Sequence, residues 1–137
     1  MNRKMYNIAL CVSSLAIGGA YYLLFKNNTI FESIVCKFVD FMPIKNRLPR
    51  ITSRFLNNHF CDFLWVFSLY CGLCAIFLPT KKQSMVIFFA VVILGIVWEL
   101  FQFYGVVGGT GDILDVVTYI FGAFVSLLIT TKKEKKK

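Results

Sequence analysis

The chain has 137 residues, of which 58% are hydrophobic, and its mean hydropathy is +0.69. Soluble domains are about 45–50% apolar, so this composition excludes an ordinary soluble domain and favours a membrane protein of one domain. The net charge of +8 would suit a nucleic-acid partner, but most basic residues flank apolar runs, where they orient helices or meet anionic lipid. We therefore expect membrane lipids as partners and no nucleic acid.

The first predicted span runs from Ile8 to Phe25, eighteen residues without a charge, and follows a basic lead with Arg3 and Lys4. A signal peptide is the competing interpretation, because Gly18-Gly19-Ala20 offers small residues of the kind found at cleavage sites. The apolar run continues beyond them as YYLLF, which favours a retained helix. The two glycines predict a close contact with another helix.

The long connection from Lys26 to Asn58 has two parts. Residues 30–42 show a helical apolar face opposite a polar face, which predicts an amphipathic helix too short to cross a bilayer. It can lie in the membrane interface or pack on other protein. After Pro43 comes a basic strip without acids, formed by Lys45, Arg47, Arg50 and Arg54. This basic strip suits a lipid phosphate and equally suits a solvated linker.

Three further apolar segments predict spans at 60–78, 85–103 and 112–130, each near the roughly 20 residues that a bilayer requires. Pro79 and a basic turn with Lys81 and Lys82 separate the first two, and a glycine-rich turn from Tyr104 to Gly111 separates the last two. A lysine-rich tail, 131–137, ends the chain. We expect an all-α integral membrane protein with four transmembrane helices plus one amphipathic interfacial helix.

Polar residues gather at one end of this predicted bundle. The second span begins, the third ends and the fourth begins on the same membrane side, and their polar faces should turn away from lipid. The expected polar cluster comprises His59, Asp62, Glu99, Gln102, Asp112 and Asp115. Asp112 and Asp115 also have a structural explanation, because acids cap and favour helix N-termini. Glu99 is harder to explain, since no basic residue of its own helix can pair with it.

Four carboxylates and one histidine suit a hard cation such as Mg²⁺ or Ca²⁺, with Glu99, Asp112 and Asp115 as the predicted ligands. A proton relay is the alternative, and zinc is disfavoured because only one histidine is present. The chain has no P-loop, no Gly-x-Ser-x-Gly elbow and no evident nucleophile–base pair, which disfavours an enzyme and leaves no catalytic residue to name. Cys71-x-x-Cys74 lies within an apolar run and is interpreted as helix packing.

The pattern Trp98-Glu99-x-x-Gln102, followed by Gly109-Thr110-x-Asp112-x-x-Asp115, resembles the VanZ-like family of small bacterial membrane proteins. Asn58-x-x-x-Asp62-x-Leu64-Trp65 is also similar, so the resemblance covers about half the chain. The chain departs from the family in its turn GVVGG, which lacks a basic residue, and in Thr118 and Tyr119, where members often have Asn. The resemblance implies a helical protein of the bacterial inner membrane and, for founding members, low-level resistance to teicoplanin-type glycopeptides; it implies no catalytic role.

Three functions remain open on these grounds. The first is an envelope protein that binds an anionic lipid or lipid-linked cell-wall precursor at the polar cluster, with the basic strip contacting the phosphate. The second is a small secondary transporter or ion-coupled carrier, which would need to be a homo-oligomer because four spans are few. The third is an enzyme acting on a lipid phosphate. Transporter sites lie near the membrane midplane, whereas these acids lie near one surface, which favours the first function.

The distribution of basic residues generates a prediction of topology. Nine basic residues lie on the side of the termini and six on the other side, so the positive-inside rule places both termini in the cytoplasm. We expect a reporter fused after Lys137 to give a cytoplasmic signal and a reporter inserted near Asn46 to give an external one. The reverse pair of signals would overturn the orientation, and signals from the same side would overturn the four-span topology.

Overall fold

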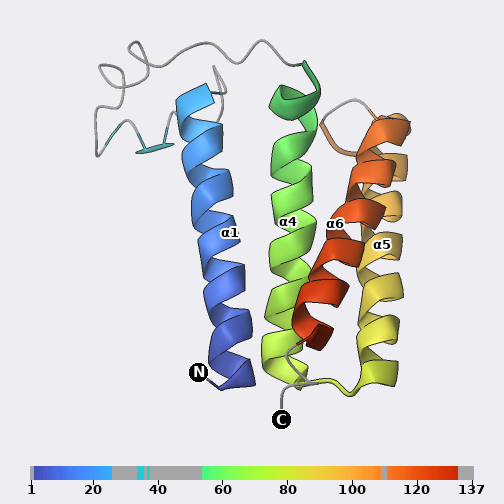
Figure 1. Ribbon diagram of the computed structural model, residues 1–137. Coiled ribbons are helices and arrows are strands. Elements are labelled where there is room, and N and C mark those ends of the chain that lie inside the picture. Colours follow the sequence, from blue (N-terminus) through green and yellow to red (C-terminus); the bar gives the residue numbers. More distant parts are fainter. Residues whose placement is uncertain (1, 26–33, 36, 38–53, 109–110, 133–137) are drawn as a thin grey trace.

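The computed structural model describes residues 2–25, 34–35, 37, 54–108 and 111–132, with the side chains of 54–58 and 132 left out. Four long helices make up this part of the chain: α1 (Arg3–Phe25), α4 (Arg54–Phe77), α5 (Lys81–Phe103) and α6 (Ile113–Lys132). They stand side by side and run alternately up and down, with the start of α1 and the end of α6 at one end of the bundle (Figure 1).

Each helix is long and apolar enough to cross a membrane, so the prediction of four spans is confirmed in length and composition. The burial pattern agrees, because large apolar side chains such as Phe89, Ile93 and Phe124 are exposed while polar ones such as Ser126 and Thr130 are buried. A water-soluble monomer rarely exposes so much contiguous apolar surface. The chain is therefore a four-helix membrane protein whose polar side chains face inward.

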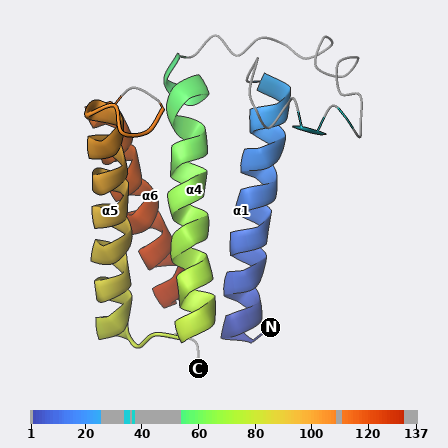
Figure 2. The same cartoon turned by 180° about the vertical axis from the view of Figure 1, so that it is seen from behind.

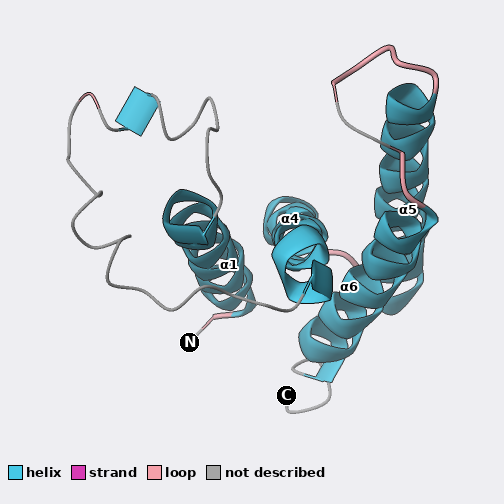
Figure 3. Ribbon diagram, turned by 90° about the horizontal axis from the view of Figure 1, so that it is seen from above, coloured by secondary structure: helices cyan, strands magenta, loops and turns pink. Residues whose placement is uncertain are grey.

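Helices α4, α5 and α6 form the core, and α1 is attached to it from one side. The core side chains are Val66, Tyr70, Cys74, Val91, Val92, Tyr119 and Ala123, none of which belongs to α1. Helix α1 packs mainly on α4, and among its described residues only Asn7 and Ser14 are buried. Figure 2 shows α4 between α1 and the α5–α6 pair, and the view from above in Figure 3 shows α5 farthest from α1.

The helix boundaries differ from the predicted spans by more than two residues at the starts of α1, α4 and α5. Helix α1 begins at Arg3, whose guanidinium donates a 2.5 Å hydrogen bond to the carbonyl oxygen of Pro79 in the α4–α5 turn. Helix α4 begins at Arg54, within the predicted connection. Helix α5 begins at Lys81, within the predicted turn, because the Gln83 side chain accepts a 2.9 Å hydrogen bond from the Thr80 backbone N–H and closes the helix start.

Two sequence expectations on α1 and the connection have different outcomes. The predicted interfacial helix at 30–42 lies outside the described residues, apart from Ile34, Val35 and Lys37. The glycine pair of α1 makes less contact than expected: a methyl group at Gly18 would lie 3.6 Å from Leu64 of α4, and one at Gly19 would meet nothing within 4 Å. Only Gly18 therefore faces another helix at ordinary packing distance.

Gly95 of α5 generates a prediction of stability. The Tyr119 ring of α6 lies so close that a β-carbon at position 95 would be 2.5 Å from it, which is an overlap. We expect Gly95→Ala to destabilise the protein by about 1–3 kcal/mol, because the ring or the helix must move. Gly19→Ala is the matched control and should be neutral or stabilising by about 0.5–1 kcal/mol, since a glycine leaves a helix without a new clash. Unfolding in detergent micelles measures both, and equal stability of the two variants would contradict this packing.

Candidate functional site

Three helix ends bring the predicted polar cluster together, at the end of the bundle opposite the chain termini. Helix α4 contributes His59 and Asp62 near the start of its apolar part, α5 contributes Glu99 one turn before its end, and Asp112 and Asp115 stand at the start of α6. Figure 1 shows this end of the bundle, where the α5–α6 turn lies beside the start of α4. The predicted convergence of three helix ends is therefore present in the structure.

His59 and Asp115 form the shortest polar contact of the cluster. The imidazole Nδ1 lies 2.5 Å from the Asp115 carboxylate Oδ1, and the two residues belong to different helices. His59 is buried and Asp115 is half-buried. Because the pair is only partly reached by water, the contact fixes the imidazole relative to the carboxylate and ties the start of α4 to the start of α6.

Asp62 completes a group of three. It lies three residues after His59 on the same face of α4, and one ligand atom from each of His59, Asp62 and Asp115 lies within 4.8 Å of the others. We call these three residues the His–Asp–Asp group. Two carboxylates so close together in a low-dielectric region repel each other when both are charged, so the group needs a proton or a cation between them.

Glu99 is buried at 6% exposure, and hydrogen bonds compensate both of its carboxylate oxygens. Its Oε1 accepts a 2.7 Å bond from the hydroxyl of Tyr119, and its Oε2 accepts a 3.0 Å bond from the backbone N–H of Asp112. The second bond requires the turn to pass very close to α5, and Gly111 allows this because a β-carbon there would lie 2.9 Å from the Glu99 carbonyl oxygen. Glu99 therefore joins α5 to the start of α6 through a hydroxyl and a backbone N–H.

Asp112 serves as a helix cap. Its Oδ1 accepts a 2.9 Å hydrogen bond from the backbone N–H of Leu114, and its backbone carbonyl accepts one from Asp115. The capping role that the sequence offered as an alternative is thus present for Asp112, while Asp115 is directed to His59 instead.

A metal ion would find a different ligand set from the predicted one. Among the described residues, the His–Asp–Asp group is the cluster with metal-ligand spacing, and of the predicted ligands Glu99, Asp112 and Asp115 only Asp115 belongs to it. Glu99 and Asp112 make hydrogen bonds with the chain itself. Two carboxylates and one imidazole are compatible with a divalent cation such as Mg²⁺, and the group leaves further coordination positions for water or ligand.

The remaining predicted residues are placed less completely. Gln102 is half-buried, one turn beyond Glu99 on α5. Within the basic strip, Lys45, Arg47 and Arg50 lie outside the described residues, and Arg54 begins α4 with its side chain undescribed. Cys71 and Cys74 are buried in the helix packing, as interpreted from the sequence.

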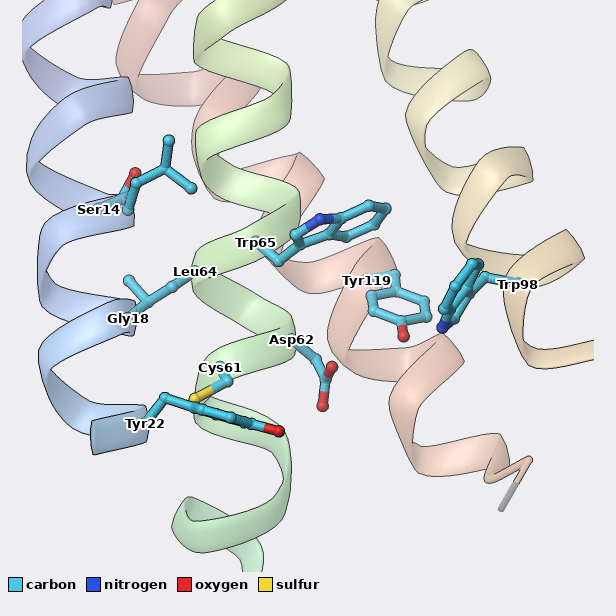
Figure 4. A pocket seen from close by; sticks show the side chains of 11 residues that line it. Ser14, Gly18, Tyr22, Cys61, Asp62, Leu64, Trp65, Trp98 and Tyr119 are labelled. Carbon is cyan, nitrogen blue, oxygen red and sulfur yellow. The ribbon is translucent and has the colours of Figure 1, made fainter. Parts of the chain in front are cut away.

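A pocket of about 510 Å³ lies directly beside the His–Asp–Asp group, and the sequence did not reveal it. Its lining comes from all four helices and comprises Ser14, Leu15, Gly18, Gly19, Tyr22, Cys61, Asp62, Leu64, Trp65, Trp98 and Tyr119. Figure 4 shows α4 behind the pocket, with α1 on one side and α5 and α6 on the other. Asp62 points into it, so the pocket and the polar cluster share one carboxylate.

The pocket has the character of an aromatic groove that is open to the side. Trp65 and Trp98 are 41% and 46% exposed, and Leu15 of α1 is also exposed. The Trp65 and Tyr119 rings contact each other edge to face at 6.1 Å between centroids. From Ser14 to Tyr22, the lining of α1 extends about 12 Å along the helix axis, from mid-helix to the end where the polar cluster lies. Trp98 beside Glu99 and Trp65 after Asp62 stood in the motifs named from the sequence, whereas Tyr22 is brought in only by helix packing.

The hydrogen bonds of Glu99 generate a prediction of stability. In Glu99→Gln the amide oxygen can accept the Asp112 N–H while the amide nitrogen donates to the Tyr119 hydroxyl oxygen, so we expect a loss of no more than about 1 kcal/mol. Glu99→Leu should cost more, because it leaves the Tyr119 hydroxyl and that N–H without acceptors. Asp112→Asn is the control and should change little, since Asn caps a helix about as well as Asp. Unfolding in micelles measures all three, and a Glu99→Leu variant as stable as wild type would refute the structural role of these bonds.

Comparisons with protein families, with curated proteins and with solved structures find no match to this chain. The resemblance to the VanZ-like family stays a prediction that rests on the motif residues named above.

Proposed function

We propose that this protein binds a membrane amphiphile, a lipid or a lipid-linked envelope precursor, in the groove between α1 and α5. The observation that carries the proposal is the continuity between an aromatic pocket and a polar cluster, because Asp62 belongs to both. An amphiphile has an apolar body, which suits the aromatic pocket, and a polar group, which suits the polar cluster. The apolar body would lie along Gly18, Gly19 and Trp65, and the polar group would reach Asp62.

The size and position of the pocket support this proposal. Ligand pockets for small molecules usually enclose about 300–1,000 Å³, and this one encloses about 510 Å³. Apolar lining with a few convergent polar groups is also typical of ligand sites. The exposed edges of Trp65, Trp98 and Leu15 lie on the surface of helices that are apolar enough to face lipid, so an amphiphile can reach the groove from the side.

The position of the polar cluster favours binding over transport. The His–Asp–Asp group lies at the helix ends rather than at mid-helix, whereas carrier sites lie near the membrane midplane. A head group held near one membrane surface fits the observed position. The predicted anionic head group depends on the basic strip, which lies outside the described residues apart from the backbone of Arg54.

Filling the pocket tests the proposal. Gly19 lines the pocket and has open space at its β-carbon, so Gly19→Leu places a side chain in the groove without a clash. We expect this variant to retain at least about fivefold less bound lipid than wild type, because the added side chain occupies volume that the ligand needs. Native mass spectrometry of gently extracted protein measures the bound lipid.

Ala20→Leu is the matched control. Ala20 is the next residue of α1, is exposed and does not line the pocket, so the substitution adds a similar side chain to the outside of the helix. This variant should retain as much lipid as wild type. Equal lipid retention by Gly19→Leu and Ala20→Leu, or no retained lipid in wild type, would overturn the proposed function.

A further inference from the structure

We propose that the polar group of the ligand is a positively charged amine or quaternary ammonium, held between Asp62 and the aromatic rings that surround it. The inference rests on the proposed function and names the chemistry of the ligand's head. It reverses the sign of the charge that the sequence led us to expect for the ligand. The reasons are the charge of the site, the aromatic rings that line it and the way in which these rings are packed.

The charge of the site is the first reason. Asp62 is the only carboxyl side chain among the described residues that line the pocket, and no lysine or arginine lies among them. Behind it lie Asp115 and the buried Glu99, and His59 is the only basic side chain in contact with this cluster among the described residues. Among the described residues, acids outnumber this one base in a region with little water, so a cation gains Coulomb energy from them and a phosphate would lose it.

The rings are the second reason. Tyr22, Trp65, Trp98 and Tyr119 approach the pocket from four different helices. Figure 4 shows the Asp62 carboxylate directed into the space between Tyr22 and Tyr119, with the indoles of Trp65 and Trp98 at its border. An aromatic face attracts a cation through the ring quadrupole, most strongly for Trp, and the attraction grows when water is removed. Several rings around one carboxylate is the arrangement by which proteins recognise ammonium groups.

The packing of the rings is the third reason. The Tyr119 hydroxyl is already engaged by Glu99, and its ring lies against Gly95 on one side and contacts Trp65 at its edge. Tyr119 is therefore fixed before a ligand arrives. The indoles of Trp65 and Trp98 keep 41% and 46% of their surface exposed, so their faces remain available. Because part of this ring set is already fixed, less side-chain entropy is lost when a ligand binds.

The test compares lipids that differ in the head group alone. The full-length protein is reconstituted with equal amounts of phosphatidylethanolamine and phosphatidylglycerol of identical acyl chains, and native mass spectrometry counts each lipid retained. We expect the amine lipid to exceed the anionic lipid roughly tenfold, which corresponds to one strong cation–aromatic contact. Asp62→Asn and Trp98→Leu should each abolish most of that preference. Phe89→Leu, an exposed ring of α5 outside the pocket, should leave it unchanged.

A second measurement uses wild-type protein alone, so it does not depend on variants that fold poorly. It also tests whether a free cation competes with the lipid head group. Tetraphenylphosphonium and tetraphenylborate have nearly the same shape and opposite charge. Added to wild-type protein, the cation should displace the retained phosphatidylethanolamine and quench tryptophan fluorescence, whereas the borate should do neither. Displacement identifies the lipid ammonium and the free cation as competitors for one site.

The outcomes distinguish this inference from the function on which it rests. The proposal of a cationic head group would be overturned by a preference for phosphatidylglycerol, by equal retention of both lipids or by binding of the borate. Amphiphile binding would still stand in these cases if Gly19→Leu removes the lipid. Retention of phosphatidylglycerol that requires added Mg²⁺ and Asp62 would overturn the cationic head group in favour of a metal-bridged phosphate. Loss of all lipid selectivity together with no effect of Gly19→Leu would overturn both proposals.

Discussion

The hydrogen bond from the Tyr119 hydroxyl to Glu99 is the interaction on which the polar end of the bundle depends. It holds a buried carboxylate of α5 against α6 at 2.7 Å, in a part of the chain where an uncompensated charge would be costly. Tyr119 can reach Glu99 only because position 95 has no side chain. The same tyrosine ring then borders the pocket. One residue thus connects helix packing, compensation of a buried acid and the shape of the groove.

Much of this arrangement follows from periodicity. Long uncharged runs predicted four helices, and the spacing of polar residues predicted which faces turn inward. Tyr119, Gly122 and Ser126 share one face of α6 with Asp115 and are all buried, and Gly95 and Glu99 are buried on the facing helix. These features could be predicted because a helix in lipid turns its apolar side chains outward and its polar side chains inward. The position of a residue in the helical repeat is enough to tell on which side it lies.

The rest depends on distances between helices, which periodicity does not contain. The sequence offered no partner for Glu99, because its partners are a hydroxyl and a backbone N–H from another helix rather than a basic residue. The sequence left capping and ligand roles open for both Asp112 and Asp115; in the structure Asp112 caps α6, and Asp115 contacts His59. The pocket was missed for the same reason, since its four rings are far apart in the chain and come together only through the packing of four helices.

Because α1 is attached by one side only, the concentration that sets the occupancy of the groove is a concentration within the membrane. The core of α4, α5 and α6 supplies the carboxylates, while α1 forms a wall that packs mainly on α4 and leaves the side toward α5 open. On the proposed function, an amphiphile entering there would come from the plane of the bilayer without crossing bulk water. Occupancy is then governed by the mole fraction of that molecule among its neighbouring lipids, and a component that is scarce per litre of cell but abundant in the membrane can keep the groove filled.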